Sequence, residues 1–297
     1  MEMLHYDFMQ RAFYAGGLIA VMASVLGVYL LLRRQALMAD MLSHVSLAGV
    51  AGGAYLHMNP TLTGFASAIV GAIAVEYVRR SYKTYSEISI AIIMVGGLSS
   101  AVVLMSLDTG LSKSFSSYLF GSVVAVTSQE LWLMLVTAVI GGLFFILLRR
   151  PLYQMAFDEE TAKTSGLPVN GLSMAFSILT GMIVASAMPI VGVLLVSSLI
   201  VLPASLAIRI ASSFAAAIGI AIATGLTGTF TGLTASYMFS TPPGGTIALT
   251  LLFLFIAGIT IKRVAVQLSK RRQRENRREA AYTQPPQSGA VSTDSLQ

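Results

Sequence analysis

The chain has 297 residues, of which 55% are hydrophobic and only 11% are charged, with a formal net charge of +6 and a mean hydropathy of +0.77. A typical soluble domain carries about 25% charged residues, so this composition excludes an ordinary soluble globular protein, and its hydrophobicity excludes a disordered one. The sequence contains no cysteine, which excludes disulfides, thiolate metal sites and cysteine nucleophiles. The apolar runs are long and continuous rather than alternating, so we expect an all-α polytopic membrane protein.

A membrane-spanning helix needs about 20 mostly apolar residues. Nine stretches meet this need, and a shorter, serine-rich stretch over 114–127 is expected to form a re-entrant or interfacial helix. The sequence predicts about eight or nine transmembrane helices. The predicted spans lie near 12–32, 41–58, 61–78, 88–107, 130–148, 171–188, 190–208, 214–238 and 245–261.

The placement of lysine and arginine predicts which ends of the spans face the cytoplasm. If 17 of the 19 basic residues lie inside, only Arg11 and Lys113 remain outside. The C-terminus is then cytoplasmic, and the N-terminus is external if there are nine spans. We expect residues 1–261 to form the transmembrane domain.

Residues 262–297 are expected to form a basic, disordered cytoplasmic tail. Its cationic cluster could bind anionic membrane lipid, although fixing the topology is enough to explain it. The pI of about 9.7 therefore does not indicate nucleic-acid binding.

Asp40 and His44 are the ionisable residues placed inside a span, where each is costly. If the chain turns back near residues 35–37, Asp40 lies about one helical turn into the next helix and His44 about two. Residues four apart share a helical face, and a carboxylate and an imidazole together can bind a divalent cation. The same pair could instead form a structural hydrogen bond or a proton relay.

Four other acidic residues lie at span ends, where ordinary solvated boundary charges explain them. They are Glu76, Glu87, Asp108 and Glu130.

A polar interval over 151–169 separates two spans and predicts a short capped helix. Asp158 is a plausible N-cap, Glu159 and Glu160 favour the first turn, and Gly166 is placed to end the helix. This helix could dock a cytoplasmic protein, or it could be a packed connection between two spans.

The sequence has no phosphate-binding loop of the G-x-x-x-x-G-K-[ST] type and no G-x-S-x-G or H-E-x-x-H motif. Energy for any transport must therefore come from an ion gradient or from a partner protein.

Several segments resemble the permeases of zinc and manganese ABC importers, the ABC-3 type. Residues 32–34, 37–40 and 42–51 resemble the second-span signature of that family, and residues 157–162 with 166–169 resemble its coupling helix. Further similar segments are 118–122, 191–196 and 202–204.

The resemblance, which covers about residues 8–261, implies a compact type II ABC importer permease that forms a homodimer around a metal path. It also implies cytoplasmic ATPase subunits that bind ATP, and an extracellular metal-binding protein. The permease itself would be no enzyme and would hold no permanent cofactor, only the transported Zn²⁺ or Mn²⁺.

Asp40 and His44 match the residues that contact the metal in this family. The segment 6–13 looks closest to zinc permeases of Gram-positive bacteria, which favours zinc over manganese. The residues expected to couple the permease to the ATPase are Phe157, Asp158, Glu159, Ala162 and Gly166.

Three other readings compete with this interpretation. A secondary metal/proton transporter would use Asp40 and His44 as a proton relay and would work without an ATPase. An intramembrane enzyme would need more deep acidic or nucleophilic residues than the spans offer, and a membrane scaffold would leave the costly Asp40–His44 pair unexplained.

Overall fold

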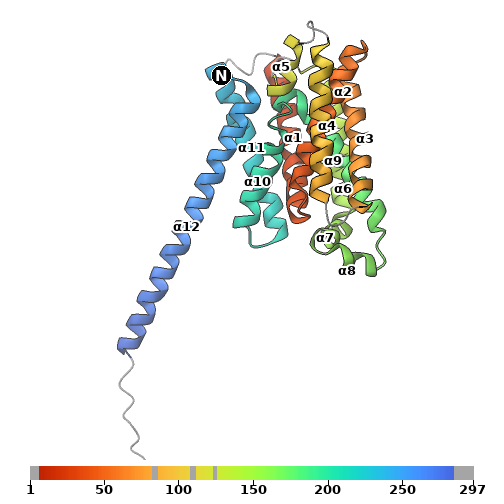
Figure 1. Cartoon of the computed structure of the whole chain (residues 1–297). Coiled ribbons are helices and arrows are strands. Elements are labelled where there is room, and N and C mark those ends of the chain that lie inside the picture. Colours follow the sequence, from red (N-terminus) through yellow and green to blue (C-terminus); the bar gives the residue numbers. More distant parts are fainter. Residues whose placement is uncertain (1–6, 82–85, 108–111, 123–125, 284–297) are drawn as a thin grey trace, which may run out of the picture. The chain divides into compact units, whose positions relative to one another are not determined.

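The computed structural model describes residues 7–81, 86–107, 112–122 and 126–283, and within these ranges every regular element is an α-helix (Figure 1). Long helices follow from the apolar composition, because intrahelical hydrogen bonds satisfy the backbone where lipid offers no partner. The chain divides into two units, Met1–Ile256 and Ala257–Gln297. The helices are α1 (Asp7–Leu32), α2 (Ala36–Tyr55), α3 (Pro60–Ser81), α4 (Ser86–Ser106), α5 (Ser112–Phe120), α6 (Ser128–Leu147), α7 (Arg149–Phe157), α8 (Glu159–Thr164), α9 (Val169–Val191), α10 (Val196–Ile210), α11 (Phe214–Phe239) and α12 (Pro243–Thr283).

Seven helices in the described part of the chain are long and apolar enough to cross a membrane: α1, α3, α4, α6, α9, α11 and α12. This confirms the polytopic helical fold, with a count slightly below the eight or nine predicted. The predicted spans 41–58 and 190–208 account for the difference. Asp40 and His44 lower the hydropathy of α2, and the 15 residues of α10 rise only about 22 Å, less than the hydrocarbon core.

The predicted span 190–208 is wrong at its start, because α9 extends into it and a short break precedes α10. Gly192 in the break has a φ of 82°, and a Cβ atom there would lie 2.4 Å from the carbonyl oxygen of Leu119. The N–H of Val193 donates to the carbonyl of Tyr118 at 2.9 Å. Close approach of α5 therefore holds this break at a glycine.

The short stretch predicted over 114–127 contains α5, whose nine residues are too few to cross a membrane. Residues 123–125 of that stretch lie outside the described residues. Helix α5 packs against α4 and α9.

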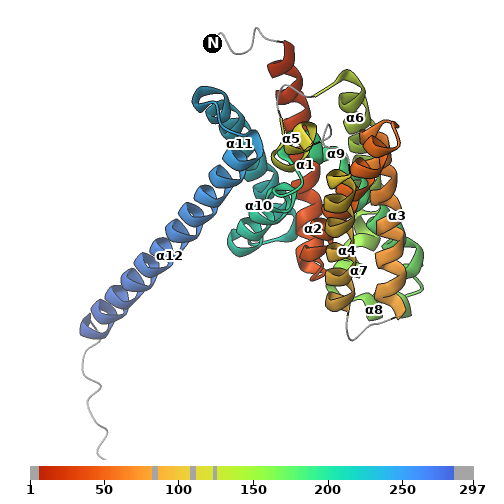
Figure 2. The same cartoon turned by 45° about the horizontal axis from the view of Figure 1, so that its top comes forward.

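Helix α2 lies inside the bundle, in contact with α3, α4, α9 and α10 (Figures 1 and 2). Helices α7 and α8 lie at the lower end of the bundle in Figure 1. We call this the arginine-rich end, because it carries Arg33, Arg79, Arg80 and Arg149 after α1, in α3 and in α7.

Helix α12 continues past its apolar part, which ends at Ser269, as far as Thr283. The tail expected from residue 262 onward is thus helical through Thr283, because its Lys, Arg, Gln, Glu and Ala residues are strong helix formers. Residues 284–297 lie outside the described part of the chain.

Gly27 allows α1 and α10 to pack closely, and its substitution is expected to destabilise the protein. A Cβ atom at Gly27 would lie 2.1 Å from the backbone oxygen of Ile200. Gly27→Ala is expected to cost about 1–3 kcal/mol through overpacking, measured as a lower Tm of the purified protein in detergent.

The matched control is Gly142→Ala in α6, because nothing lies within 4 Å of a Cβ atom there. This change is expected to leave the Tm unchanged or slightly higher, since alanine favours helix. Equal Tm values for the two variants would contradict the close packing of α1 against α10.

Candidate functional site

A tight turn between α1 and α2 places Asp40 and His44. Arg34 adopts a left-handed φ of 56°, and the N–H of Gln35 donates to the carbonyl of Leu30 at 2.8 Å. This six-to-one bond ends α1 in a Schellman motif, so α2 begins at once. Asp40 therefore lies about one turn and His44 about two turns into α2, as the sequence predicts.

His44 is a buried imidazole with one ring nitrogen that lacks a hydrogen-bond partner in the described part of the chain. The residue is only 8% exposed, and its Nδ1 has no hydrogen-bond partner among the described residues. Asp40, one turn earlier on the same face, is half-buried and makes no hydrogen bond or ion pair within the described ranges. Buried polar atoms are normally paired, so this nitrogen marks a place where a further group is expected to bind.

Close backbone packing fixes α2 at this level. A Cβ atom at Gly97 of α4 would lie 3.1 Å from the carbonyl carbon of His44. On the α3 side, the Ser46 hydroxyl donates to the carbonyl of Gly64 at 3.0 Å. The Ser43 hydroxyl, between Asp40 and His44 in sequence, donates to a carbonyl one turn earlier in its own helix, at 2.9 Å.

The described part of one chain supplies too few ligands for a closed metal site. Within the described ranges, no group of three or more His, Asp or Glu side chains lies close enough to hold a metal ion. His57 ends α2 in a left-handed conformation with a φ of 55°, and His5 lies outside the described residues. Asp40 and His44 can therefore provide two ligands, which suits a transient site better than a structural one.

Helix α8 is a six-residue helix with both ends capped as predicted. The Asp158 carboxylate accepts the N–H groups of Glu160 at 3.0 Å and Thr161 at 3.1 Å. Hydrogen bonds from the hydroxyl and the N–H of Thr161, followed by that from Glu160, hold the pKa of Asp158 below its usual range. Gly166 adopts a φ of 83° directly after the helix, which confirms its predicted role in ending it.

The structure separates the expected coupling residues into two sets. Ala162 is buried in the main hydrophobic core, and Glu159 reaches the arginines that follow α1 and end α3. Phe157 and Asp158 are exposed, and a Cβ atom at Gly166 would meet nothing within 4 Å. Ala162 and Glu159 therefore attach α8 to the bundle. Phe157, Asp158 and Gly166 lie on the exposed surface around α8.

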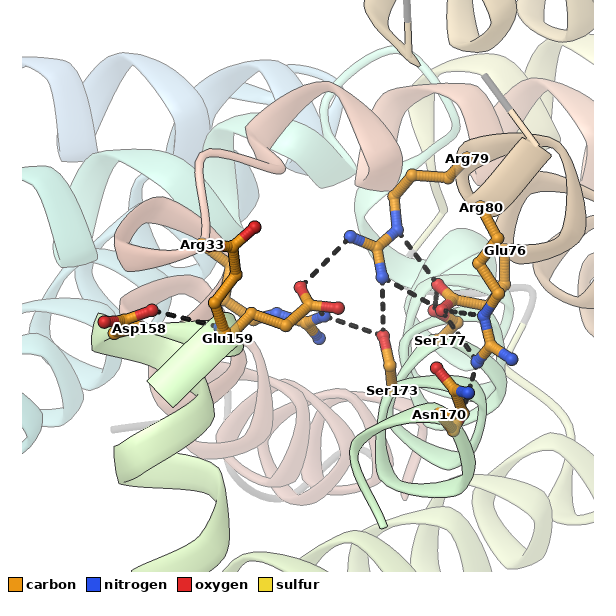
Figure 3. Close-up of polar contacts among 10 residues, drawn as sticks. Arg33, Glu76, Arg79, Arg80, Asp158, Glu159, Asn170, Ser173 and Ser177 are labelled. Carbon is orange, nitrogen blue, oxygen red and sulfur yellow. Dashed lines mark hydrogen bonds and ion pairs between the residues drawn. The ribbon is translucent and has the colours of Figure 1, made fainter. Parts of the chain in front are cut away.

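A charge cluster at the arginine-rich end is centred on Glu76 (Figure 3). Glu76 is 1% exposed and accepts hydrogen bonds from Arg79 at 2.9 Å, Arg80 at 3.1 Å and the Ser177 hydroxyl at 2.9 Å. The interpretation of Glu76 as a solvated boundary charge is therefore wrong. The carboxylate is buried because α9 packs against α3 at this level.

Arg33 joins α1 to this cluster. Its guanidinium donates to the Ser173 hydroxyl at 2.7 Å, lies 4.9 Å from the ring centre of Phe176 and pairs with Glu159 at 3.8 Å. Burial lowers the pKa of Arg33 to about 10, an effect that the positive charge of Arg79 increases and the charge of Glu159 opposes. Arg33 thus remains charged at neutral pH in a nearly closed environment.

The other boundary acids differ from one another. Glu130 is buried, and its carboxylate accepts the N–H of Thr127 at 2.9 Å and the hydroxyl of Thr61 at 3.0 Å. It forms a capping box at the start of α6, so the boundary-charge interpretation is wrong here as well. Glu87 is exposed as predicted, and Asp108 lies outside the described residues.

Sequence reasoning missed the α9 side of the charge cluster. Ser173 and Ser177 bind the charged side chains of α3, and the Arg80 guanidinium donates to the carbonyl of Asn170. Two serines four residues apart share one helical face, a pattern that could have indicated a polar partner for charges on a neighbouring helix.

The helices long and apolar enough to cross a membrane, with a capped short helix at the arginine-rich end, are those of a polytopic membrane protein. Residues 5–262 match the family model described as the ABC 3 transport family, and the chain belongs to this family. It is therefore the permease subunit of an ABC transporter and not an enzyme, and the ATPase is a separate subunit.

Individual relatives match over most of their length. The chain is 33% identical over 263 residues to the "Probable metal transport system membrane protein" of Treponema pallidum, covering 88% of this chain and 98% of that protein. It is 27% identical over 258 residues to the "Manganese transport system membrane protein MntC" of Halalkalibacterium halodurans, covering 86% and 87%. A solved structure, "PsaBC from Streptococcus pneumoniae in complex with Fab", aligns with a TM-score of 0.76 at 26% identity, over 85% of this chain and 91% of that one.

Removing the carboxylate of Glu76 is expected to destabilise the arginine-rich end. Glu76→Ala leaves Arg79 and Arg80 facing α9 without their shared anion, at a cost of about 2–3 kcal/mol. This is below the usual range for a fully buried pair, because both arginines reach solvent. The expected result is a lower Tm, whereas Glu87→Ala, at an exposed carboxylate on α4, should leave the Tm close to wild type. A Glu76→Ala protein as stable as the Glu87→Ala protein would contradict the cluster's structural role.

Proposed function

We propose that this chain is the permease of an ABC importer that moves a divalent metal ion across the cell membrane, using ATP hydrolysed by its partner subunit. The observation that carries the proposal is the buried His44 imidazole, unpartnered at Nδ1 and one turn from the half-buried Asp40. A nitrogen and a carboxylate oxygen on one helical face are ligands that divalent transition metals accept. The named functions of the relatives, metal and manganese transport, support the same conclusion.

The metal passes Asp40 and His44 at the interface between two copies of the chain. Each copy offers two ligands, so two copies offer the four that zinc commonly takes in proteins. Asp40 supplies negative charge and His44 a neutral nitrogen donor. A site assembled from two subunits can open when the subunits move, which lets the ion bind and then leave.

The transported ion belongs to the first-row divalent metals. The start of the sequence favours zinc, whereas several relatives are named as manganese transport proteins. Carboxylate and imidazole accept both ions, so these two ligands do not select between them. An extracellular binding protein that delivers the ion would contribute to the selection.

The arginine-rich end faces the cytoplasm, as does the C-terminus, because this orientation keeps most basic residues inside. The exposed surface formed by Phe157, Asp158 and Gly166 then faces the ATPase subunits. ATP-driven closure of those subunits moves α8 and switches the permease between outward-open and inward-open states.

Metal uptake by cells that lack their own importers tests the transport proposal. With the ATPase subunit and binding protein present, the chain is expected to accumulate Zn²⁺ or Mn²⁺, and the preferred ion identifies the substrate. Asp40→Asn and His44→Gln should each reduce uptake by more than about tenfold. Each change keeps a side chain of similar size but removes the carboxylate or the imidazole that would bind the metal.

Ser43→Ala is the matched control, since it changes a buried polar residue between Asp40 and His44 whose hydroxyl donates to the carbonyl of Ala39 in the same helix. It should retain uptake. Full uptake by the Asp40 and His44 variants would refute the metal contact. Uptake without the ATPase, abolished by collapsing the proton gradient, would instead identify a secondary transporter.

The N-cap of α8 provides a test of ATPase docking. Asp158→Ala removes the acceptor for two backbone N–H groups and should fray α8, so the affinity for the ATPase subunit falls several-fold. Asp158→Ser restores a capping oxygen and should recover most of that affinity. Binding is measured between purified permease in nanodiscs and the ATPase, and equal affinities for all three proteins would exclude docking through α8.

A further inference from the structure

Two carboxylates in the charge cluster differ sharply in their surroundings. The Glu76 side chain is 1% exposed and its nearest arginine nitrogen lies at 2.9 Å, whereas the Glu159 side chain is 44% exposed and pairs at 3.4 and 3.8 Å. A buried, tightly bonded pair is hard to separate, while a partly hydrated pair contributes little and separates easily. Glu76 is therefore a fixed anchor, and Glu159 is a contact that can break and form again.

The two arginines that Glu159 contacts meet at one point. Arg33 and Arg79 both donate to the hydroxyl of Ser173 on α9, at 2.7 and 2.8 Å. Glu159 approaches the same two guanidinium groups from α8, as Figure 3 shows. One carboxylate thus connects α8 with the end of α1 and the end of α3, against a fixed support on α9.

This contact stands out among the side chains of α8. Within the described residues, Glu159 is the side chain of α8 that forms ion pairs with other helices, while Ala162 contributes an apolar contact to the core. The neighbouring Glu160 is exposed and forms no such pair in the same ranges.

The charge cluster contains more arginines than carboxylates, so loss of the Glu159 contact is expected to affect the helices that carry the arginines. The cluster holds three arginines, Arg33, Arg79 and Arg80, but two carboxylates. The Arg33 side chain is 2% exposed, and its Nη1 has no partner among the described residues. When Glu159 moves away, Arg33 and Arg79 face each other with less compensation, which favours separation of the ends of α1 and α3.

We propose that Glu159 is a positioning residue that couples movement of α8 to α1 and α3 through its ion pairs with Arg33 and Arg79. Helix α1 leads through the turn at Arg34 directly into α2, so movement of its end reaches the helix that carries Asp40 and His44. This inference rests on the proposed function and assigns Glu159 to transmission within the permease rather than to contact with the ATPase.

The test uses the assembled complex of permease, ATPase and binding protein in proteoliposomes, with metal uptake and ATP hydrolysis measured on the same preparation. Glu159→Gln keeps the size of the side chain and removes its charge. The expected result is normal assembly and continued ATP hydrolysis, with the number of ions transported per ATP reduced about threefold to tenfold. Glu87→Gln, the same change at an exposed carboxylate on α4, should leave this ratio unchanged.

A double variant identifies the partner. If Glu159 acts through Arg79, Glu159→Gln combined with Arg79→Gln should lower the ratio no further than Arg79→Gln alone. If the Glu159→Gln complex fails to assemble, Glu159→Asp provides a second variant in which to measure the number of ions transported per ATP. It retains the charge but has a shorter side chain, which lengthens an ion pair already at 3.4 Å, so a smaller reduction in the same direction is expected.

Each other outcome has a defined meaning. If the wild-type complex shows no ATP-dependent metal uptake, the proposed function fails. If the wild type transports metal and the Glu159 variants assemble with an unchanged ratio, the coupling role alone is refuted. If the Glu159 variants are less thermally stable but transport the same number of ions per ATP, Glu159 has a structural role and no coupling role.

Discussion

The constraint that organises this protein is the lack of hydrogen-bonding partners in lipid, which requires polar groups in the bundle to be satisfied by the chain itself. Glu76 meets this requirement through two arginines and a serine, and Glu130 meets it through a capping box. Among the buried side-chain atoms without a partner in the described residues, His44 Nδ1 is the one that belongs to an imidazole, a group that commonly ligates metals in proteins. Two buried carboxylates are thus hydrogen-bonded by the chain itself, whereas the His44 imidazole on α2 keeps a buried nitrogen without a partner in the described part of the chain.

The turn between the end of α1 and the start of α2 links the Asp40–His44 pair to the charge cluster. Arg33 and Arg34 stand directly between α1 and α2, and Arg33 is held by α9 through Ser173. The same turn therefore belongs to the charge cluster and sets the depth of Asp40. This arrangement gives a short physical route between α8 and the proposed metal path, without requiring large changes in the packed helices.

Local features of the site could be predicted from the sequence. Asp158 and Gly166 follow from capping chemistry, which depends on residues within one turn, and the depth of Asp40 and His44 follows from the position of the arginine pair. The burial of Glu76 could not be predicted, because its partner Ser177 lies 101 residues away on α9. The helix break at Gly192 depends in the same way on contact with α5, which hydropathy does not register.

Anomalous X-ray diffraction from crystals of the assembled complex soaked with Mn²⁺ or Zn²⁺ tests the central claim most directly. We expect an anomalous peak in contact with the Asp40 carboxylate and the His44 imidazole, absent from crystals of the Asp40→Asn, His44→Gln double variant. A bound metal elsewhere in the permease, with His44 hydrogen-bonded to another protein group, would contradict it.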